Sequence, residues 1–428
     1  MMGTSNKSIE KRQPVLSGES DLTLEVVILI IFGIFMLLFG IFLFQIHTGA
    51  LPYAPDSTYG LFLLLVAIQM ITMGKTPFGD LQRSWFLILI GICVAIVGMA
   101  ASFIPGYLSF QVKEIVGFIL LAGGAALLLQ LFVREDKART WKQYPGVIRQ
   151  LILACGLVYA ISCICGLITL APGITTDYQT AVILILYSMS FFYIAFCIQR
   201  VKRQDPLTGQ TDSGAQEEQV QQAEGFKKIF KEVTLSISVG VVLLVATLLT
   251  LLGILLIPVN LGLLPFSQDG LLGMLLVIFS IQMMALGETP LGPYKRSWFL
   301  IIIGIIFATL GISACIVPGL LTSLLQVLVG LLNIIGGVIL LFMRFYPILQ
   351  AKRNPPEQPA ISHPLLLKMG ITQTILNFVS IAFGISMLIP GIIPGIINAN
   401  IIIVNGLLLF VLTSFILKAE VIARELQI

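Results

Sequence analysis

Charged residues are scarce in this sequence. Asp, Glu, Lys and Arg make up 11% of its 428 residues, whereas hydrophobic residues make up 57%. Soluble domains carry about 25% charged residues. So much apolar surface cannot be enclosed within one water-soluble globule of this length. We therefore exclude a soluble domain and expect an integral membrane protein, whose spanning helices each need about 20 apolar residues.

Groups that perform chemistry are also missing. The chain has two histidines, and its six cysteines all lie within apolar runs without forming a CxxC pair. No HExxH motif, nucleophile–base set or carboxylate cluster is present. No ionisable residue lies in the middle of an apolar run, where ion-coupled transporters usually keep such groups. We predict no enzymatic activity, no metal and no cofactor.

Twelve apolar runs are present. We interpret each as a membrane-spanning helix, because backbone amides in lipid must be hydrogen-bonded within their own segment. The predicted fold class is therefore an all-α integral membrane protein with twelve transmembrane helices. The runs lie near residues 24–46, 59–74, 84–104, 111–133, 147–171, 179–199, 233–257, 270–287, 297–317, 322–343, 365–389 and 396–418.

The chain contains an internal duplication. Residues 69–106 and 282–319 align without a gap and are identical at 20 of 38 positions, including Gln, Thr, Pro, Arg and Trp residues. Such a repeat indicates the architecture before any motif is considered. We predict two six-helix repeats, a linker and two short tails, with bounds of 1–23 (tail), 24–199 (first repeat), 200–232 (linker), 233–418 (second repeat) and 419–428 (tail). The basic segment 226–233 is either an amphipathic helix on the membrane surface or an extension of the next helix.

The basic residues indicate an orientation. If the N-terminus lies in the cytoplasm, 24 of the 25 Lys and Arg residues fall on cytoplasmic segments or helix ends, and only Lys113 does not. This distribution follows the positive-inside rule. We expect a multi-pass protein of the cell membrane with both termini in the cytoplasm. The net charge of +4 gives no indication of a nucleic-acid partner.

Proline–glycine turns divide each half further. Proline ends a helix and glycine supplies the positive φ that the reversal needs. We therefore predict three helical hairpins in each repeat, the first of which has a longer turn. The four short turns read Ile104-Pro105-Gly106, Ala171-Pro172-Gly173, Val317-Pro318-Gly319 and Ile389-Pro390-Gly391.

Tryptophan, glycine and proline recur at matching distances in the two halves, at Trp85, Gly91, Gly98, Pro105, Gly117 and Gly123, and at Trp298, Gly304, Gly311, Pro318, Gly330 and Gly336. This spacing resembles the HdeD-type acid-resistance membrane proteins, which are six-helix proteins built from short two-helix repeats. This chain departs from that family by having two six-helix halves. The resemblance implies a membrane location and a stress-related role, and it supplies no catalytic residues.

One turn motif is duplicated, as Gly74-Lys75-Thr76-Pro77-Phe78-Gly79 and Gly287-Glu288-Thr289-Pro290-Leu291-Gly292. It is not a phosphate-binding P-loop, because Gln69 stands where that loop needs glycine and Glu288 replaces its lysine. One interpretation is a tight cytoplasmic turn. The other is a shallow vestibule where the two turns meet, because the preceding run of about 16 residues spans only roughly 24 Å and short, interrupted helices often mark a transporter's site.

Three duplicated pairs of polar residues form the candidate site: Gln69 and Gln282, Thr76 and Thr289, and Arg83 and Arg296. The glutamines either hydrogen-bond a neighbouring helix or line the vestibule. The arginines, each followed by Ser-Trp, either meet phosphate headgroups above a serine-capped helix or bind an anionic lipid or solute specifically.

Two functional interpretations follow, because an intramembrane transferase needs a polar cluster that the sequence lacks. The first is a non-enzymatic membrane component with a structural, stress-related or complex-forming role. Its partners are membrane lipids, a second copy of the chain or other membrane proteins. The alternative is a facilitator of a neutral or lipidic solute, with a pathway between the two halves.

Overall fold

The computed structural model describes residues 22–80, 83–133, 147–204, 236–353 and 364–425. In this part of the chain, twelve helices are long and apolar enough to cross a membrane, which confirms the predicted membrane-type all-α fold. The segment 226–233 and most of the N-terminal tail lie outside the described residues. The helices are α1 (Leu24–His47), α2 (Pro55–Met73), α3 (Trp85–Phe103), α4 (Ser109–Val133), α6 (Val147–Leu170), α7 (Asp177–Gln204), α9 (Ile237–Asn260), α10 (Gln268–Leu286), α11 (Trp298–Ile316), α12 (Thr322–Arg353), α13 (Pro364–Leu388) and α14 (Gly395–Glu425).

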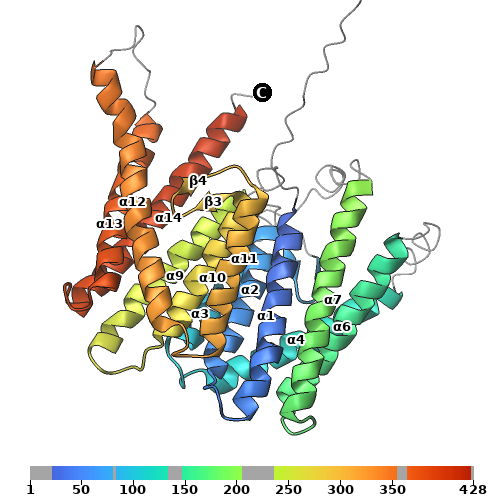
Figure 1. Ribbon diagram of the computed structural model, residues 1–428. Helices are drawn as coiled ribbons and strands as arrows, with labels where there is room; N and C mark the ends of the chain where they lie inside the picture. The colour runs from blue at the N-terminus through green and yellow to red at the C-terminus, as the bar shows by residue number, and fades with distance from the viewer. Residues whose placement is uncertain (1–21, 81–82, 134–146, 205–235, 354–363, 426–428) are drawn as a thin grey trace, which may run out of the picture.

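The centre of the molecule contains helices from both halves of the chain. Helices α2, α3, α10 and α11 contact one another together with α1 and α9, while α4, α6 and α7 lie on one side and α12, α13 and α14 on the other (Figure 1). Ala54 N donates a hydrogen bond of 3.0 Å to Ile316 O, and Ser267 N donates one of 2.9 Å to Phe103 O. Each bond joins the start of one half's second helix to the end of the other half's third helix, so the two halves interlock.

The helices do not pair as the predicted hairpins require. Helix α1 packs mainly against α7 rather than α2, and α3 packs against α2 rather than α4. Glycines explain these pairs, since a Cβ at Gly60 would lie 2.3 Å from Gly98 O, and one at Gly40 would lie 2.9 Å from Ala181 O. Helices approach this closely only where a small residue stands at the crossing. The three-hairpin arrangement is therefore not confirmed, and of the pairs predicted in the first half only α6 and α7 pack extensively.

The contacts of the first half recur in the second. Helix α9 packs against α14, α10 against α11, and α12 against α13, as α1 packs against α7, α2 against α3, and α4 against α6. The glycine crossing recurs as well, because a Cβ at Gly273 would lie 2.5 Å from Gly311 O. Corresponding sequence positions thus make corresponding helix contacts.

Several helices are longer than the sequence predicts, and the largest extension is that of α12, which continues to Arg353. Helix α2 begins at Pro55 and has 19 residues, a length of roughly 28 Å, because proline is well suited to the first helical turn. It is therefore close to the ~30 Å of a bilayer core, and the argument for a vestibule from a short helix fails. Helix α7 continues to Gln204 and α14 to Glu425, through residues assigned to the linker and the C-terminal tail.

The duplicated turn motif forms a tight two-stranded turn in each half. Strand β1 (Lys75–Thr76) pairs with β2 (Gly79–Asp80), and β3 (Glu288–Thr289) pairs with β4 (Gly292–Pro293). Each turn rests on the fourth helix of its own half, where a Cβ at Gly123 would lie 2.7 Å from Pro77 O. The motif is thus a tight turn, as one of the two interpretations predicts, while its cytoplasmic location stays a prediction; the contact with the fourth helix gives a structural reason for the motif's identity in both halves.

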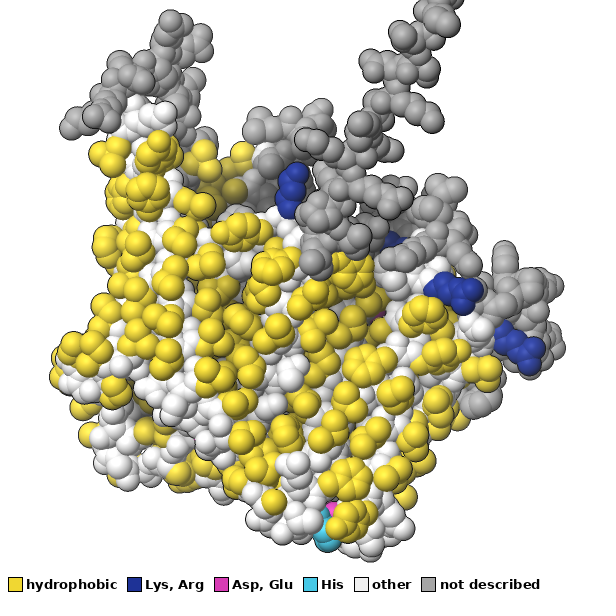
Figure 2. Space-filling view, viewed as in Figure 1, with side chains coloured by type: hydrophobic (Ala, Val, Ile, Leu, Met, Phe, Trp, Pro, Cys, Tyr) yellow, Lys and Arg dark blue, Asp and Glu magenta, His cyan; other side chains and the backbone are white. Residues whose placement is uncertain are grey.

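The two ends of the molecule differ in charge. Lys and Arg side chains gather at one end of the apolar surface, which we call the basic end (Figure 2). The opposite end holds the proline–glycine turns, which we call the proline-turn end. Its glycines have the positive φ that the sequence predicts, with values of 88° at Gly106, 99° at Gly173, 81° at Gly319 and 89° at Gly391.

Candidate functional site: two cavities within the first half

Five helices of the first half close into a ring. Going round it, α1 contacts α7, then α6, α4 and α2 follow in turn, and α2 contacts α1 again. Two cavities lie inside this ring. The Lys113 cavity has a volume of about 260 Å³ and reaches the proline-turn end, and the Gln69 cavity has a volume of about 250 Å³ and reaches the basic end. Neither lies between the two halves, where the sequence predicts a pathway.

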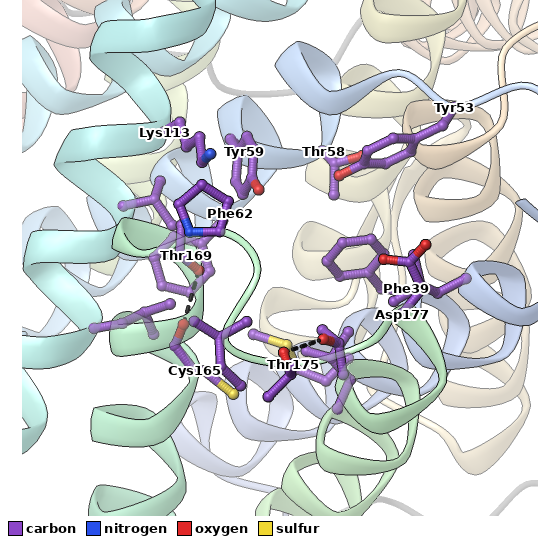
Figure 3. A pocket seen from close by; sticks show the side chains of 18 of the residues that line it. Phe39, Tyr53, Thr58, Tyr59, Phe62, Lys113, Cys165, Thr169, Thr175 and Asp177 are labelled. Carbon is purple, nitrogen blue, oxygen red and sulfur yellow. Dashed lines mark hydrogen bonds between the residues drawn. The ribbon is translucent and has the colours of Figure 1, made fainter. Parts of the chain in front are cut away.

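The Lys113 cavity has a polar rim and an apolar interior. Lys113 comes from α4, Tyr59 from α2 and Asp177 from the first turn of α7, whereas Tyr53 precedes α2. Lys113 and Tyr59 lie on one side of the cavity, and Tyr53 and Asp177 lie on the other (Figure 3). Such a lining, largely apolar with a few convergent polar groups, is typical of small-molecule sites.

The charges of this cavity are unevenly balanced. Asp177 Oδ2 lies 2.7 Å from His47 Nδ1, within hydrogen-bonding distance, at the exposed edge of the rim. Lys113 is half-buried, and none of the described carboxylates lies within salt-bridge distance of it. Burial raises the pKa of the Tyr53 hydroxyl well above its ordinary value, so Tyr53 stays neutral. The lysine is therefore a charge on the rim that no described carboxylate contacts.

The Gln69 cavity ends at an ion pair. Lys75 Nζ donates to Glu25 Oε1 at the basic end, and both side chains are about one-third exposed. Gln69 and Thr76 line the same cavity, on α2 and on the turn that follows it. Two of the six predicted site residues thus lie at a cavity, and they lie within the first half.

Two side chains separate the cavities. Phe62 of α2 and Leu120 of α4 line both of them and are only 6% and 8% exposed. Phe32 packs edge-on against Phe62, with ring centroids 5.9 Å apart, and stacks on Phe191 at 5.6 Å. The ring of helices therefore contains a nearly continuous space that is interrupted by side chains.

The predicted arginines have a structural role. Arg83 Nε donates to Ile71 O at 2.9 Å, and Arg296 Nε donates to Met284 O at 3.2 Å. These acceptors belong to the last turns of α2 and α10, where main-chain carbonyls have no partner within the helix. Arg296 also donates to Leu22 O, across the two halves of the chain. These contacts are with main-chain carbonyls, and the predicted roles of the arginines toward headgroups or a ligand stay predictions.

The remaining predicted residues are placed by local structure. The Thr76 and Thr289 hydroxyls donate to Gly79 O at 2.7 Å and Gly292 O at 2.8 Å, which closes each turn. Gln282 is half-buried in α10. None of the cavities described above joins the two turns, so the predicted vestibule between them has no counterpart there.

Several cavity residues were not in the predicted site. Tyr59 and Phe62 lie within an apolar run and have no feature in the sequence that distinguishes them from core residues. Asp177 lies just after a proline–glycine turn, where a polar residue needs no special explanation. Lys113 did carry a signal, because it is the one basic residue that departs from the charge pattern of the chain.

Comparison with known proteins gives no relative: no protein-family model, curated protein or solved structure matches the chain. Among the described residues, no group of three or more His, Cys, Asp or Glu side chains is placed to hold a metal ion. The geometry of the cavities is therefore the basis for the functional proposal.

Proposed function

We propose that this protein is a membrane facilitator that carries a small amphipathic solute through the five-helix ring of its first half. One observation supports this above all: two cavities extend from opposite ends of the ring and share Phe62 and Leu120 as their common wall. A solute in either cavity meets side chains rather than main chain at the wall. Side chains change rotamer far more readily than helices move.

The lining indicates the class of solute. Both cavities are mainly apolar with hydroxyl, amide and charged groups near their outer rims, so a molecule with one polar end and one apolar end fits best. No ionisable side chain stands at the common wall, which favours passive movement over coupling to protons or ions. The pathway proposed here runs within one half, instead of between the halves as the sequence suggested.

In this proposal the second half has a structural role: it holds helices of the first half in place. The matched contacts of Gly60 with Gly98 and of Gly273 with Gly311, together with the duplicated sequence, favour an origin of both halves from one six-helix unit. The position equivalent to Phe62 is Leu275, which is 3% exposed in the central core. We propose that the second half holds α2 and α3 in place while the first half admits the solute.

A second proposal is the structural, stress-related or complex-forming membrane role that the HdeD-type resemblance implies. One observation favours it: the apolar windows of α13 and α14 are only 28% and 17% buried, whereas that of α7 is 50% buried. This surface is available to lipids, to a second copy of the chain or to another membrane protein. Such a role requires no movement of solute past Phe62.

Flux measurements distinguish the two proposals. Three amphiphiles with the same octyl tail serve as radiolabelled probes in proteoliposomes: octanesulfonate, octyl glucoside and octyltrimethylammonium. If the ring conducts, Phe62→Leu widens the wall and raises the flux of at least one probe severalfold, and Phe62→Trp lowers it. Leu275→Met, a conservative change in the second half, serves as the control and leaves flux unchanged. Equal flux of every probe through all variants and through protein-free liposomes would refute the facilitator.

A further inference from the structure

Lys113 is unusual among the basic residues of this protein. In the part of the chain that the structure describes, Lys113 is the one Lys or Arg at the proline-turn end. All other described Lys and Arg residues lie at or near the basic end. The Lys113 side chain is half-buried beside an apolar cavity, and an anion that pairs with its ammonium group would offset the cost of removing that group from water. No described carboxylate provides that charge.

The acidic residues near Lys113 do not contact its ammonium group. Asp177 lies across the cavity from Lys113 (Figure 3), and its Oδ2 lies within hydrogen-bonding distance of His47 Nδ1 instead. Glu114 is the next residue of α4, but it does not line the cavity, as expected because adjacent helical residues point to different faces. The ammonium group therefore has room for an anion that comes from outside the chain.

The second half shows that the fold does not need a cation here. The equivalent position holds Gln326, whose amide Nε2 donates to Met387 O of α13 at 2.6 Å. A neutral side chain at this place thus joins two helices of the second half. The lysine of the first half has no such bond to α6 among the described contacts, so packing does not explain it.

The rest of the cavity suits an apolar tail. Phe35, Phe39, Leu184 and Phe62 line the space between the rim and the wall. Lys113 is the fifth residue of α4 and therefore lies near the membrane surface, where a charged headgroup keeps part of its hydration. The volume of about 260 Å³ lies just below the common range of roughly 300–1,000 Å³ for ligand sites, which favours a short single chain over a two-chain lipid.

We propose that the Lys113 cavity binds an anionic single-chain amphiphile, with its headgroup on the Lys113 ammonium and its tail directed toward Phe62. The proposal deepens the proposed function, on which its relevance to transport rests, by naming the class of solute. Binding itself does not depend on transport. A sulfonate, phosphate or carboxylate headgroup would satisfy the lysine equally well in its charge.

Equilibrium binding of the three octyl probes to the full-length protein in nanodiscs of neutral lipid tests this directly. We expect octanesulfonate to bind about tenfold more tightly than octyl glucoside, which corresponds to one charge-assisted contact, and octyltrimethylammonium to bind most weakly. Lys113→Gln, which introduces the residue of the second half, removes the preference for the sulfonate. Glu114→Gln, a charge change on the adjacent residue, retains the preference.

Each outcome decides the proposal. A preference for octanesulfonate that survives in Lys113→Gln, or that is lost equally in Glu114→Gln, would overturn it. Nanodiscs containing phosphatidylglycerol distinguish the source of the anion. If this lipid competes with octanesulfonate for the protein, the ligand is a membrane lipid and not a free amphiphile. That result would contradict the proposal of a single-chain solute. The flux assay on Phe62 variants is separate. Flux of the probes without any charge preference in the binding assay refutes this inference alone. Charge-selective binding without flux refutes the facilitator alone.

Discussion

The carboxylate of Asp56 holds the proline-turn end of the first half together, and its removal gives a measurable prediction. Asp56 Oδ2 accepts a hydrogen bond of 2.6 Å from Gly106 N and one of 2.8 Å from Ser109 Oγ. These groups belong to the turn after α3 and to the first turn of α4, whereas Asp56 is in the first turn of α2. One side chain thus fixes three helices relative to one another.

The size of the effect follows from burial. Asp56 is 6% exposed, so water competes weakly for its hydrogen bonds, and two bonds to a charged acceptor are worth about 3–6 kcal/mol together. Asp56 Oδ1 is buried without a hydrogen-bond partner, and that penalty of about 1–3 kcal/mol disappears with the side chain. The midpoints of these two ranges differ by about 2.5 kcal/mol, and the Asp56→Ala variant should lose roughly this much of the free energy of unfolding.

The assay is equilibrium unfolding in mixed micelles, with sodium dodecyl sulfate as the denaturant and helix content as the signal. Ser109→Ala removes one of the two bonds and is combined with Asp56→Ala in a double-mutant cycle. Asp269→Ala is the matched variant of the second half. Asp269 accepts from Gly319 N at 3.1 Å and from the Thr322 hydroxyl, but it is only partly buried, so its loss should cost less.

Two results would refute this reasoning. If the effects of Asp56→Ala and Ser109→Ala add without a coupling energy, the hydrogen bond between the two side chains contributes nothing to stability. If Asp269→Ala destabilises the protein as much as Asp56→Ala, burial does not determine the strength of these contacts.

Two further predictions use the same unfolding assay. Gly123→Ala should cost about 1–3 kcal/mol, because its Cβ would lie 2.7 Å from Pro77 O, whereas Gly156→Ala should cost little because its Cβ would lie 3.6 Å from Leu131 Cδ2. Equal costs would contradict the packing of the turn on α4. Replacing Glu25 and Lys75 by glutamine, singly and together, should give a coupling energy below about 1 kcal/mol, since the two side chains are 36% and 35% exposed. A larger coupling would show that this ion pair is shielded from water.

The helices themselves could be predicted from the sequence because lipid leaves the backbone few alternatives. An apolar run must satisfy its own amides, and this requirement alone yields a helix. The end of α2 is marked by Gly74, which has a φ of 71° and caps the helix. The serines before Trp85 and Trp298 cap α3 and α11 as predicted, by accepting from main-chain amides two residues beyond each tryptophan. Helix-forming apolar runs and helix-capping residues can therefore be recognised in a single sequence.

The pairing of helices could not be predicted in the same way. Gly98 is visible in the sequence as a small residue in an apolar run, but nothing there identifies Gly60 as the residue that it crosses. A glycine in an apolar run indicates that another helix approaches closely at that position, but it does not indicate which helix this is. Connection by a short turn suggested that α3 would pack on α4, and the contact between Gly60 and Gly98 outweighs that expectation.

The duplicated residues of the candidate site belong to the framework that both halves share. Sequence identity between the halves drew attention to Thr76, Arg83 and their equivalents, and these residues prove to close turns and to cap helices. Such roles depend on main-chain geometry that both halves share, so they keep the same side chains. Identity after a duplication therefore marks the common framework, and a function carried by one half is better sought where the halves differ.

The differences lie around the ring. Val116 lines the Lys113 cavity and is 2% exposed, and its equivalent in the second half, Val329, is buried with Leu272 and Leu325 in a separate apolar cluster. Leu272 stands at the position of Tyr59, a hydroxyl-bearing residue of the cavity rim. The same arrangement of helices thus encloses a cavity where it carries Tyr59 and packs a cluster of aliphatic side chains where it carries Leu272. Close packing favours stability, so we propose that the hollow in the first half serves a ligand, whose properties should follow from the residues that only the first half possesses.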